Sequence, residues 1–194
     1  SRHGQIERRI AAAAERAKPR AFVNNWSLDD LAPLADKLAS GRSFERGKAL
    51  FSVASCSTCH QIAGQGGRVG PDLTEIAQRM AKRDNPRLAM LTEILDPSRV
   101  VDEKYRTQVI LTHDGQRLAG VVIEETADYL RLAANPARPD EVRRLDKSAI
   151  DERHESPVSL MPVGLLNALS ADEILDLAAY LESGGKIDHP AFRP

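Results

Sequence analysis

Four segments of the chain carry apolar residues every three or four positions, which is the spacing of one face of an α-helix. These segments are residues 44–53, 73–82, 86–95 and 171–183. Each follows a residue type that commonly caps helices, and these residues are Ser43, Asp72, Asn85 and Ser170. Glutamates three positions after Asp72 and Ser170 complete two capping boxes, and Pro97 and Gly184 lie where helices should end. We therefore predict four helices.

Between the third and fourth of these helices the pattern changes to short runs that alternate or stay apolar, as β-strands do. The predicted strands are residues 105–112, 118–124, 129–133 and 142–145. Asp114-Gly115 separates the first two strands and is a strong hairpin signal. Short strands with turns between them indicate a small antiparallel sheet or a partly open barrel. The expected fold class is α+β, with a mainly helical core.

Residues 1–42 precede the predicted helices and differ from them in composition. The first 24 residues hold six arginines and lysines against two glutamates, and Ala11–Ala14 favour a helix. A basic helix can dock on an acidic partner, but a solvated linker is the more ordinary interpretation. We expect an N-terminal helical extension or linker.

Composition limits the possible functions. A chain of 194 residues allows one domain with insertions or two small domains. Its formal net charge of −1 argues against a general nucleic-acid binder, and its 42% of apolar residues argues against extended disorder. No apolar run is long enough to span a membrane, and the first residues do not resemble a signal peptide. Aromatic residues make up only 4%, so a large cofactor would have room to supply part of the core.

The two cysteines, Cys56 and Cys59, stand directly before His60 in the stretch C-S-T-C-H. This spacing is the attachment motif of c-type haem, because both thiols can add to the vinyl groups of one macrocycle while the histidine becomes an axial ligand of the iron. Other interpretations are a disulfide or redox pair, two incidental thiols, or a zinc site completed by His113 or His154. The redox pair lacks a preceding βαβ unit, and the zinc site lacks a second paired element. Covalent haem is therefore favoured.

Together the segments R-G-K-A-L-F, C-S-T-C-H, G-P-D-L and L-A-A-Y-L-E resemble a class I cytochrome c. The resemblance implies that the first and last helices of the core cross closely, through Gly47 and Phe51 on one helix and Tyr180 on the other. It also implies that the carbonyl group of Pro71 accepts the Nδ1–H of His60. Such a bond would fix the tautomer of the ligand.

The same resemblance implies a methionine as the second axial ligand. Met80 and Met90 lie on helical stripes, where methionine ordinarily fills gaps in the core. Met161 lies in a constrained loop before the last helix, which is where the family places its ligand. The expected metal ligands are therefore His60 and Met161. The alternatives, which would give a bis-histidine haem of lower potential, are His113 and His154.

His60 and Met161 stand 101 positions apart (60 to 161), which is more than a compact class I cytochrome needs. With the further stretches I-L-D-P-S-R-V, K-Y-R-T, H-D-G-Q-R-L-A-G and S-L-M-P, residues 44–190 resemble the haem-binding domain of large planctomycete and verrucomicrobial proteins. That resemblance implies a β insertion before the ligand methionine, and often a place within a larger secreted protein. The expected parts are the extension, the haem-attachment part, the β insertion, and the methionine loop with the last helix, at residues 1–42, 43–102, 103–156 and 157–194.

These features predict a monohaem c-type cytochrome domain that transfers single electrons and is not itself an enzyme. Haem c is the expected cofactor, and the residues expected to bind it are Cys56, Cys59, His60, Pro71 and Met161. Candidates for contact with the haem propionates are Arg68, Arg79, Trp26 and Tyr105. The expected partner is a redox protein or a fused dehydrogenase or oxidase module, with no nucleic acid and no membrane span.

Because c-type haem is attached outside the cytoplasm, a periplasmic or other extracytoplasmic location is expected. Two further hypotheses stay open at this point. One is a haem-based sensor or catalyst with an open or labile sixth position. The other is a structural or interaction role for the β insertion, whose modest basic cluster consists of Arg143, Arg144 and Lys147.

Overall fold

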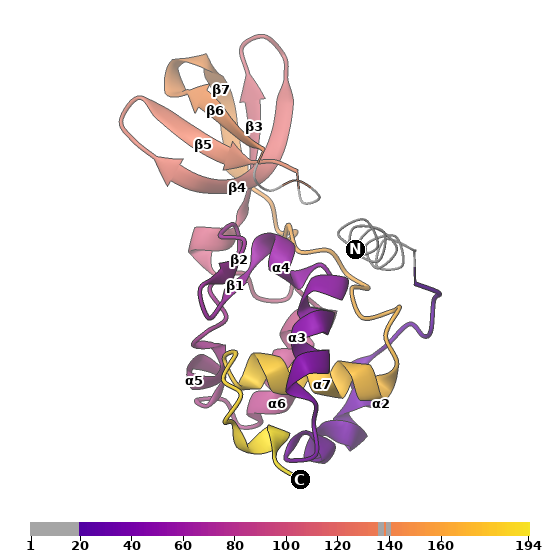
Figure 1. Cartoon of the computed structure of the whole chain (residues 1–194). Helices are drawn as coiled ribbons and strands as arrows, with labels where there is room; N and C mark the ends of the chain where they lie inside the picture. Colours follow the sequence, from indigo (N-terminus) through magenta and orange to yellow (C-terminus); the bar gives the residue numbers. More distant parts are fainter. Residues whose placement is uncertain (1–19, 136–137, 139–140) are drawn as a thin grey trace, which may run out of the picture.

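A computed structural model describes residues 20–135, 138 and 141–194. The predicted helix at Ala11–Ala14 lies outside the described residues. The chain forms two regions, a group of helices at one end and a β-sheet at the other (Figure 1). The mixed α+β class expected from the sequence is confirmed.

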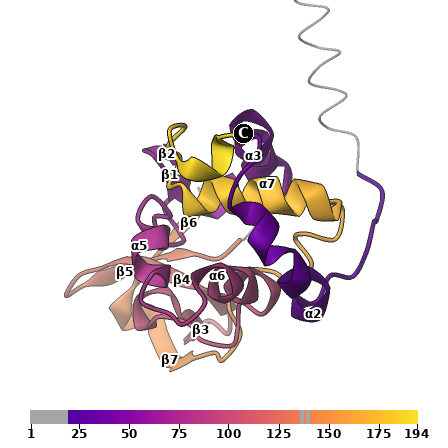
Figure 2. The ribbon, with the colours of Figure 1, turned by 90° about the horizontal axis from the view of Figure 1, so that it is seen from below.

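The helical region is built from two stretches of sequence on either side of the sheet. Its first stretch holds α2 (Leu28–Leu31), η1 (Ala32–Leu38), α3 (Phe44–Val53), α4 (Cys56–Cys59), α5 (Ile76–Met80) and α6 (Pro86–Leu95), with a two-residue hairpin of β1 (Gln61–Ile62) and β2 (Gln65–Gly66). The second stretch holds α7 (Ala171–Glu182) and η4 (Pro190–Phe192). α7 contacts both α3 and α6 and lies between them (Figure 2).

Caps explain where the three longest helices begin. The Ser43 hydroxyl accepts the N–H of Arg46, and the Asn85 side chain accepts the N–H of Leu88. Ser170 and Glu173 form a reciprocal capping box at the start of α7. The predicted helices 44–53 and 86–95 are confirmed, and α7 covers the fourth prediction to within one residue.

The helix expected over residues 73–82 is shorter than predicted. The Asp72 carboxylate accepts the N–H and the hydroxyl group of Thr74, which closes a tight turn instead of capping a helix. As a result, α5 begins only at Ile76, and no side chain caps it.

α3 and α7 cross at Gly47, as expected. A Cβ atom at this position would lie 2.3 Å from the carbonyl oxygen of Asp176, so only glycine permits this approach. Beside the crossing, the rings of Phe51 and Tyr180 are 5.9 Å apart, and Phe44 meets Tyr180 edge-on at 5.4 Å. The crossing predicted from Gly47, Phe51 and Tyr180 is confirmed.

A buried carboxylate ties the same two helices together. Asp176 of α7 is fully buried and accepts the N–H of Ser43 at 3.1 Å, at the start of α3. It also pairs with the guanidinium groups of Arg42 and Arg46. Because a buried charge without partners is costly, this set of contacts fixes the position of α7 on the N-terminal end of α3.

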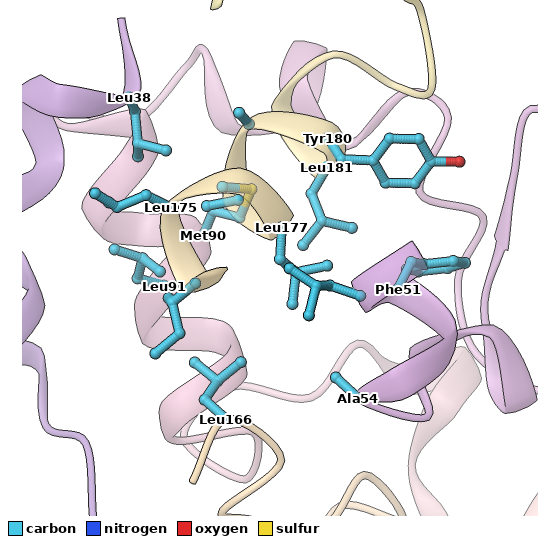
Figure 3. Close-up of a cluster of buried hydrophobic side chains, with 14 of the residues drawn as sticks. Leu38, Phe51, Ala54, Met90, Leu91, Leu166, Leu175, Leu177, Tyr180 and Leu181 are labelled. Atoms are coloured by element: carbon cyan, nitrogen blue, oxygen red, sulfur yellow. The ribbon is translucent and has the colours of Figure 1, made fainter. Parts of the chain in front are cut away.

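The core of the helical region lies around α7 (Figure 3). Leu177, Tyr180 and Leu181 of α7 meet Phe51 of α3 and Leu91 of α6 there. Leu31 and Leu38 are also fully buried in it. Residues 28–38 therefore contribute to the core, and the 3₁₀ geometry of η1 explains why no helical stripe marks residues 32–38.

The second region is one antiparallel sheet in the order β6-β5-β4-β3-β7. Its strands are β3 (Thr107–Thr112), β4 (Arg117–Glu125), β5 (Tyr129–Ala133), β6 (Val142–Asp146) and β7 (Ile150–Glu155). The described strands β6 and β7 are both edges, so the sheet is open and not a closed barrel. Short 3₁₀ turns, η2 (Glu103–Tyr105) and η3 (Lys147–Ala149), precede β3 and β7.

Four strands were predicted, and the structure has five in this sheet. The missing one, β7, reads I-D-E-R-H-E and is exposed along nearly its whole length, so it carries no alternation of apolar and polar residues. The first strand begins at Thr107 rather than at residue 105, since Tyr105 belongs to η2. The hairpin at Asp114-Gly115 is confirmed, with Gly115 at a φ of +83°.

Candidate functional site

The two cysteines lie on a single helical turn, α4, which directly follows α3. The N–H of His60 donates to the carbonyl oxygen of Cys56 at 2.9 Å and closes the turn. Residues three apart on such a turn share a face, so Cys56 and Cys59 point to the same side. His60 itself has extended backbone angles and leaves the turn as its C-cap. Local geometry therefore puts the two thiols on one face of the turn, with His60 directly after them.

The loop that follows, residues 64–73, folds back over this turn. The N–H of Gly67 donates to the carbonyl oxygen of Ser57, and the N–H of Gly70 donates to that of Cys59, both at 2.9 Å. Leu73 bonds to Gln61 in the same manner at 2.7 Å. These backbone contacts hold the loop close to His60.

The imidazole of His60 is held on two sides. Its Nδ1–H donates to the carbonyl oxygen of Pro71 at 2.9 Å, because a carbonyl oxygen can only accept. Gly70 packs against the ring, and a Cβ atom at this position would lie 2.6 Å from Cε1 of His60. The lone pair is thereby left on Nε2, which no described residue engages in a hydrogen bond.

Burial controls the protonation states at this turn. It raises the pKa of the Cys56 thiol to about 12 and also raises the pKa of Cys59. The pKa of His60 is lowered, chiefly by burial and further by the charge of Arg79, against the opposing bond to Pro71. At neutral pH the chain thus presents two protonated thiols and a neutral imidazole. A thioredoxin-like redox pair would instead need a lowered thiol pKa.

The described part of the chain offers no support for the zinc alternative. There, no three His, Cys, Asp or Glu side chains form a group able to hold a metal ion. Nδ1 of His113 lies 3.5 Å from a carboxylate oxygen of Asp151 on β7, and His154 is also on β7.

The three methionines differ in their surroundings. Met90 is buried in the helical core and Met80 packs against it, in agreement with their interpretation as core residues. Met161 is half-buried in the loop between β7 and α7 and belongs to neither hydrophobic cluster. Its N–H donates to the hydroxyl of Ser159 at 3.1 Å. Ligation of iron by Met161 stays a prediction.

The four candidates for propionate contacts have partners in different parts of the described chain. Arg79 donates to the carbonyl oxygen of Asp72 at 3.0 Å, and Arg68 donates to the side chain of Gln61 at 3.1 Å. Trp26 bonds to the carbonyl oxygen of Leu169 before α7. Tyr105 lies in η2 under the ammonium group of Lys104. Only Arg79 acts on the electrostatics of His60.

Comparison with known families bears on this site. Residues 44–131 match the family model Cytochrome c. The matched segment begins at the first residue of α3, contains α4, His60 and Pro71, and ends within β5. It supports a cytochrome c-like domain with covalent haem and a role in electron transfer. No curated protein matches the chain.

Sequence reasoning missed three residues that shape this part of the molecule. Gly70 packs on the ring of His60, the hydroxyl of Ser98 accepts the N–H of Ser159, and the hydroxyl of Ser159 accepts the N–H of Met161. Each lies in a stretch that the sequence analysis quoted. Gly70 begins G-P-D-L, Ser98 lies in D-P-S-R, and Ser159 begins S-L-M-P. The stretches were visible, but the contacts that give these residues a role were not.

Proposed function

We propose that the chain is a monohaem c-type cytochrome domain that carries single electrons, with His60 and Met161 as the axial ligands of its iron. The observation that carries the proposal is the orientation of the His60 ring. The bond from Nδ1–H to Pro71 at 2.9 Å leaves the lone pair on Nε2, as a metal-binding imidazole requires.

The residues present fit a covalent haem. Cys56 and Cys59 share one helical turn and are free thiols, so both are available for thioether bonds. Pro71 and Gly70 orient the imidazole from behind, which limits the movement of Nε2. When bound, haem supplies an iron that changes between Fe(III) and Fe(II). Methionine with histidine favours the reduced state and raises the potential relative to harder ligands.

What the other two methionines already do supports the choice of Met161 as the ligand. Met80 and Met90 already contribute to the helical core, so using either as a ligand would remove packing from that core. Met161 has no such duty among the described contacts, and its loop includes Gly164 at a φ of +78°. A loop of this kind presents a side chain without disturbing a helix.

Location and partners follow from the proposed chemistry. Covalent haem implies maturation outside the cytoplasm, so we place the domain in the periplasm or another extracytoplasmic space. None of the helices that the structure describes has the length and apolar character that a membrane crossing needs. The electron donor or acceptor would be a separate redox protein or a fused dehydrogenase or oxidase module, as in the planctomycete and verrucomicrobial domains the sequence resembles.

Absorption spectra of the matured protein test the proposal. We expect covalent haem in a denatured pyridine complex, a low-spin spectrum in both oxidation states, and no response of the ferrous form to carbon monoxide. Met161→Ala should lose the charge-transfer band between methionine sulfur and ferric iron and should bind carbon monoxide. Met80→Leu is the matched control and should retain both wild-type properties.

Other outcomes would overturn separate parts of the proposal. Absence of covalent haem would refute the cytochrome itself. A wild-type protein that is high-spin, or that binds carbon monoxide readily, would have an open or labile sixth position and would support the sensor or catalyst hypothesis instead.

A further inference from the structure

Two segments connect the sheet to the helical region, and they lie against each other. The outgoing segment, residues 96–106, follows α6, and the return segment, residues 156–170, leads to α7. Near the sheet, Arg106 pairs with Glu155 at 2.9 Å. The N–H of Ser156 donates to the carbonyl oxygen of Thr107 at 2.8 Å. The two connections are therefore joined where they leave the sheet.

Nearer the helices, the contact between the two segments is made by serine hydroxyl groups. The N–H of Ser159 donates to the hydroxyl oxygen of Ser98 at 3.0 Å. The hydroxyl oxygen of Ser159 in turn accepts the N–H of Met161 at 3.1 Å. Two hydrogen bonds in series thus run from the outgoing segment to the backbone of Met161.

The starting point of this series is well anchored. Ser98 directly follows Pro97, which is buried at the end of α6. The N–H of Arg99 donates to the carbonyl oxygen of Asp96 at 3.2 Å and closes a turn around Ser98. Both serines are partly buried, so water competes less for their hydroxyl groups than it would on an open surface.

We propose that Ser98 and Ser159 are positioning residues for Met161, and that they fix its backbone so that its sulfur stays within reach of the iron. This inference rests on the proposed function, because it concerns the same axial ligand. It assigns a role to the stretches D-P-S-R and S-L-M-P, which lie 61 positions apart at the serines and meet only in the folded chain. Met161 should therefore stay bound to the iron only while the outgoing and return segments remain in contact.

Imidazole binding to the ferric, haem-loaded protein measures the proposed role, since imidazole must displace the methionine. A typical hydrogen bond has a net value that corresponds to about a fivefold change in an equilibrium constant. Ser159→Ala should therefore raise the apparent imidazole affinity about fivefold and weaken the methionine–iron charge-transfer band. Ser98→Ala acts through Ser159 and should raise the affinity about two- to threefold.

Three further variants separate positioning from general damage. Ser159→Thr keeps the hydroxyl group and should restore near wild-type affinity. Ser156→Ala is the matched control, because the Ser156 hydroxyl accepts the N–H of Val158 in the same segment but does not contact Met161. The double variant of Ser98 and Ser159 should bind imidazole no more tightly than Ser159→Ala, since both changes interrupt one series.

The outcomes distinguish the two proposals. A wild-type protein without the charge-transfer band would overturn both the Met161 ligation and the positioning role. A wild-type band together with equal imidazole affinities for Ser159→Ala and Ser156→Ala would overturn the positioning role alone. If Ser159→Ala does not mature, failure of Ser98→Ala to exceed the Ser156→Ala control would overturn the role in the same way.

Discussion

The helical region and the sheet are stabilised in different ways. Among the described residues, the helical cluster contains eighteen buried hydrophobic side chains and the sheet cluster only three, Ile110, Leu130 and Leu132. The sheet instead carries ion pairs on its surface, such as those from Glu125 to Lys147 and Arg153. Surface pairs contribute little each, whereas apolar burial contributes most of the stability of a domain. We therefore expect the helical region to be the more stable of the two.

The largest effect should come from the buried carboxylate between α3 and α7. Asp176→Ala leaves the N–H of Ser43 and the Nε–H of Arg46 without their acceptor, and we expect it to lower the free energy of unfolding by about 4 kcal/mol. Urea denaturation followed by circular dichroism measures this. The control is Asp172→Ala, because Asp172 pairs with the same arginines but is exposed, so its loss should cost at most about 1 kcal/mol. Equal losses would contradict the special role of Asp176.

A change in the small core of the sheet should separate the two regions. Leu132 is fully buried, and Leu132→Ala should destabilise the sheet by about 3 kcal/mol. Hydrogen exchange should then show loss of protection in β3–β5 while the amides of α7 stay protected. The partly exposed Ile123 of β4 supplies the control, Ile123→Ala, with a much smaller effect. Equal loss of protection in α7 would show that the two regions unfold as one unit.

A substitution behind the histidine tests the loop over α4. Gly70→Ala would place a methyl group against the His60 ring, so we expect a loss of about 2 kcal/mol in unfolding free energy and a shifted reduction potential of the haem-loaded protein. Gly64→Ala meets open space and carries only the strain of a φ of +77°, so it should leave the potential unchanged. If the two variants have the same reduction potential, the contact between Gly70 and the His60 ring does not influence that potential.

The smallest effect concerns the charged surface of the sheet. Hydrogen bonds from Arg153 and Lys147 lower the pKa of Glu125 to about 2 from its usual 4.5. A carboxyl group with a lowered folded-state pKa stabilises the protein above its unfolded pKa, and that contribution is lost as the pH falls from about 4.5 to about 2. Because Glu125 is partly exposed, we expect about 0.5–1 kcal/mol.

Acid titration of stability checks this expectation. Glu125→Gln should be less stable than wild type at pH 7 and should show a weaker loss of stability below pH 4.5. Glu152→Gln on β7, which forms no ion pair among the described residues, should follow the wild-type curve. A wild-type curve for Glu125→Gln would show that the two ion pairs are energetically neutral.

Local signals explain which parts of the fold were predictable. The starts of α3, α6 and α7 were predictable because a capping residue adjoins each apolar stripe. β7 was missed because an exposed edge strand needs no apolar face. α2 was missed because four residues are too few to show a helical period, and η1 was missed because a 3₁₀ helix lacks that period. Periodicity reports burial against one face, so it does not detect elements without such a face.

The same distinction applies to the candidate site. Cys56, Cys59 and His60 are neighbours in sequence, so their spacing alone shows the chemistry they share. The contact from His60 to Pro71 spans 11 positions and was expected only from a family resemblance. The contact between Ser98 and Ser159 spans 61 positions and depends on how two connections pack. No local pattern carries that information.

The pairing of Gln108 with Glu155 has a consequence for how the chain tolerates additions. The path leaves the helical region and returns to it through adjacent strands, so residues 107–155 begin and end at nearly one point in space. Ser43 and Asp176, which must meet, are 133 positions apart, and removing the sheet would shorten that loop by less than half. Each halving changes the entropy of loop closure by only about 0.6 kcal/mol. The segment that joins β3 to β7 could therefore become longer or shorter with little effect on the stability of the crossing between α3 and α7.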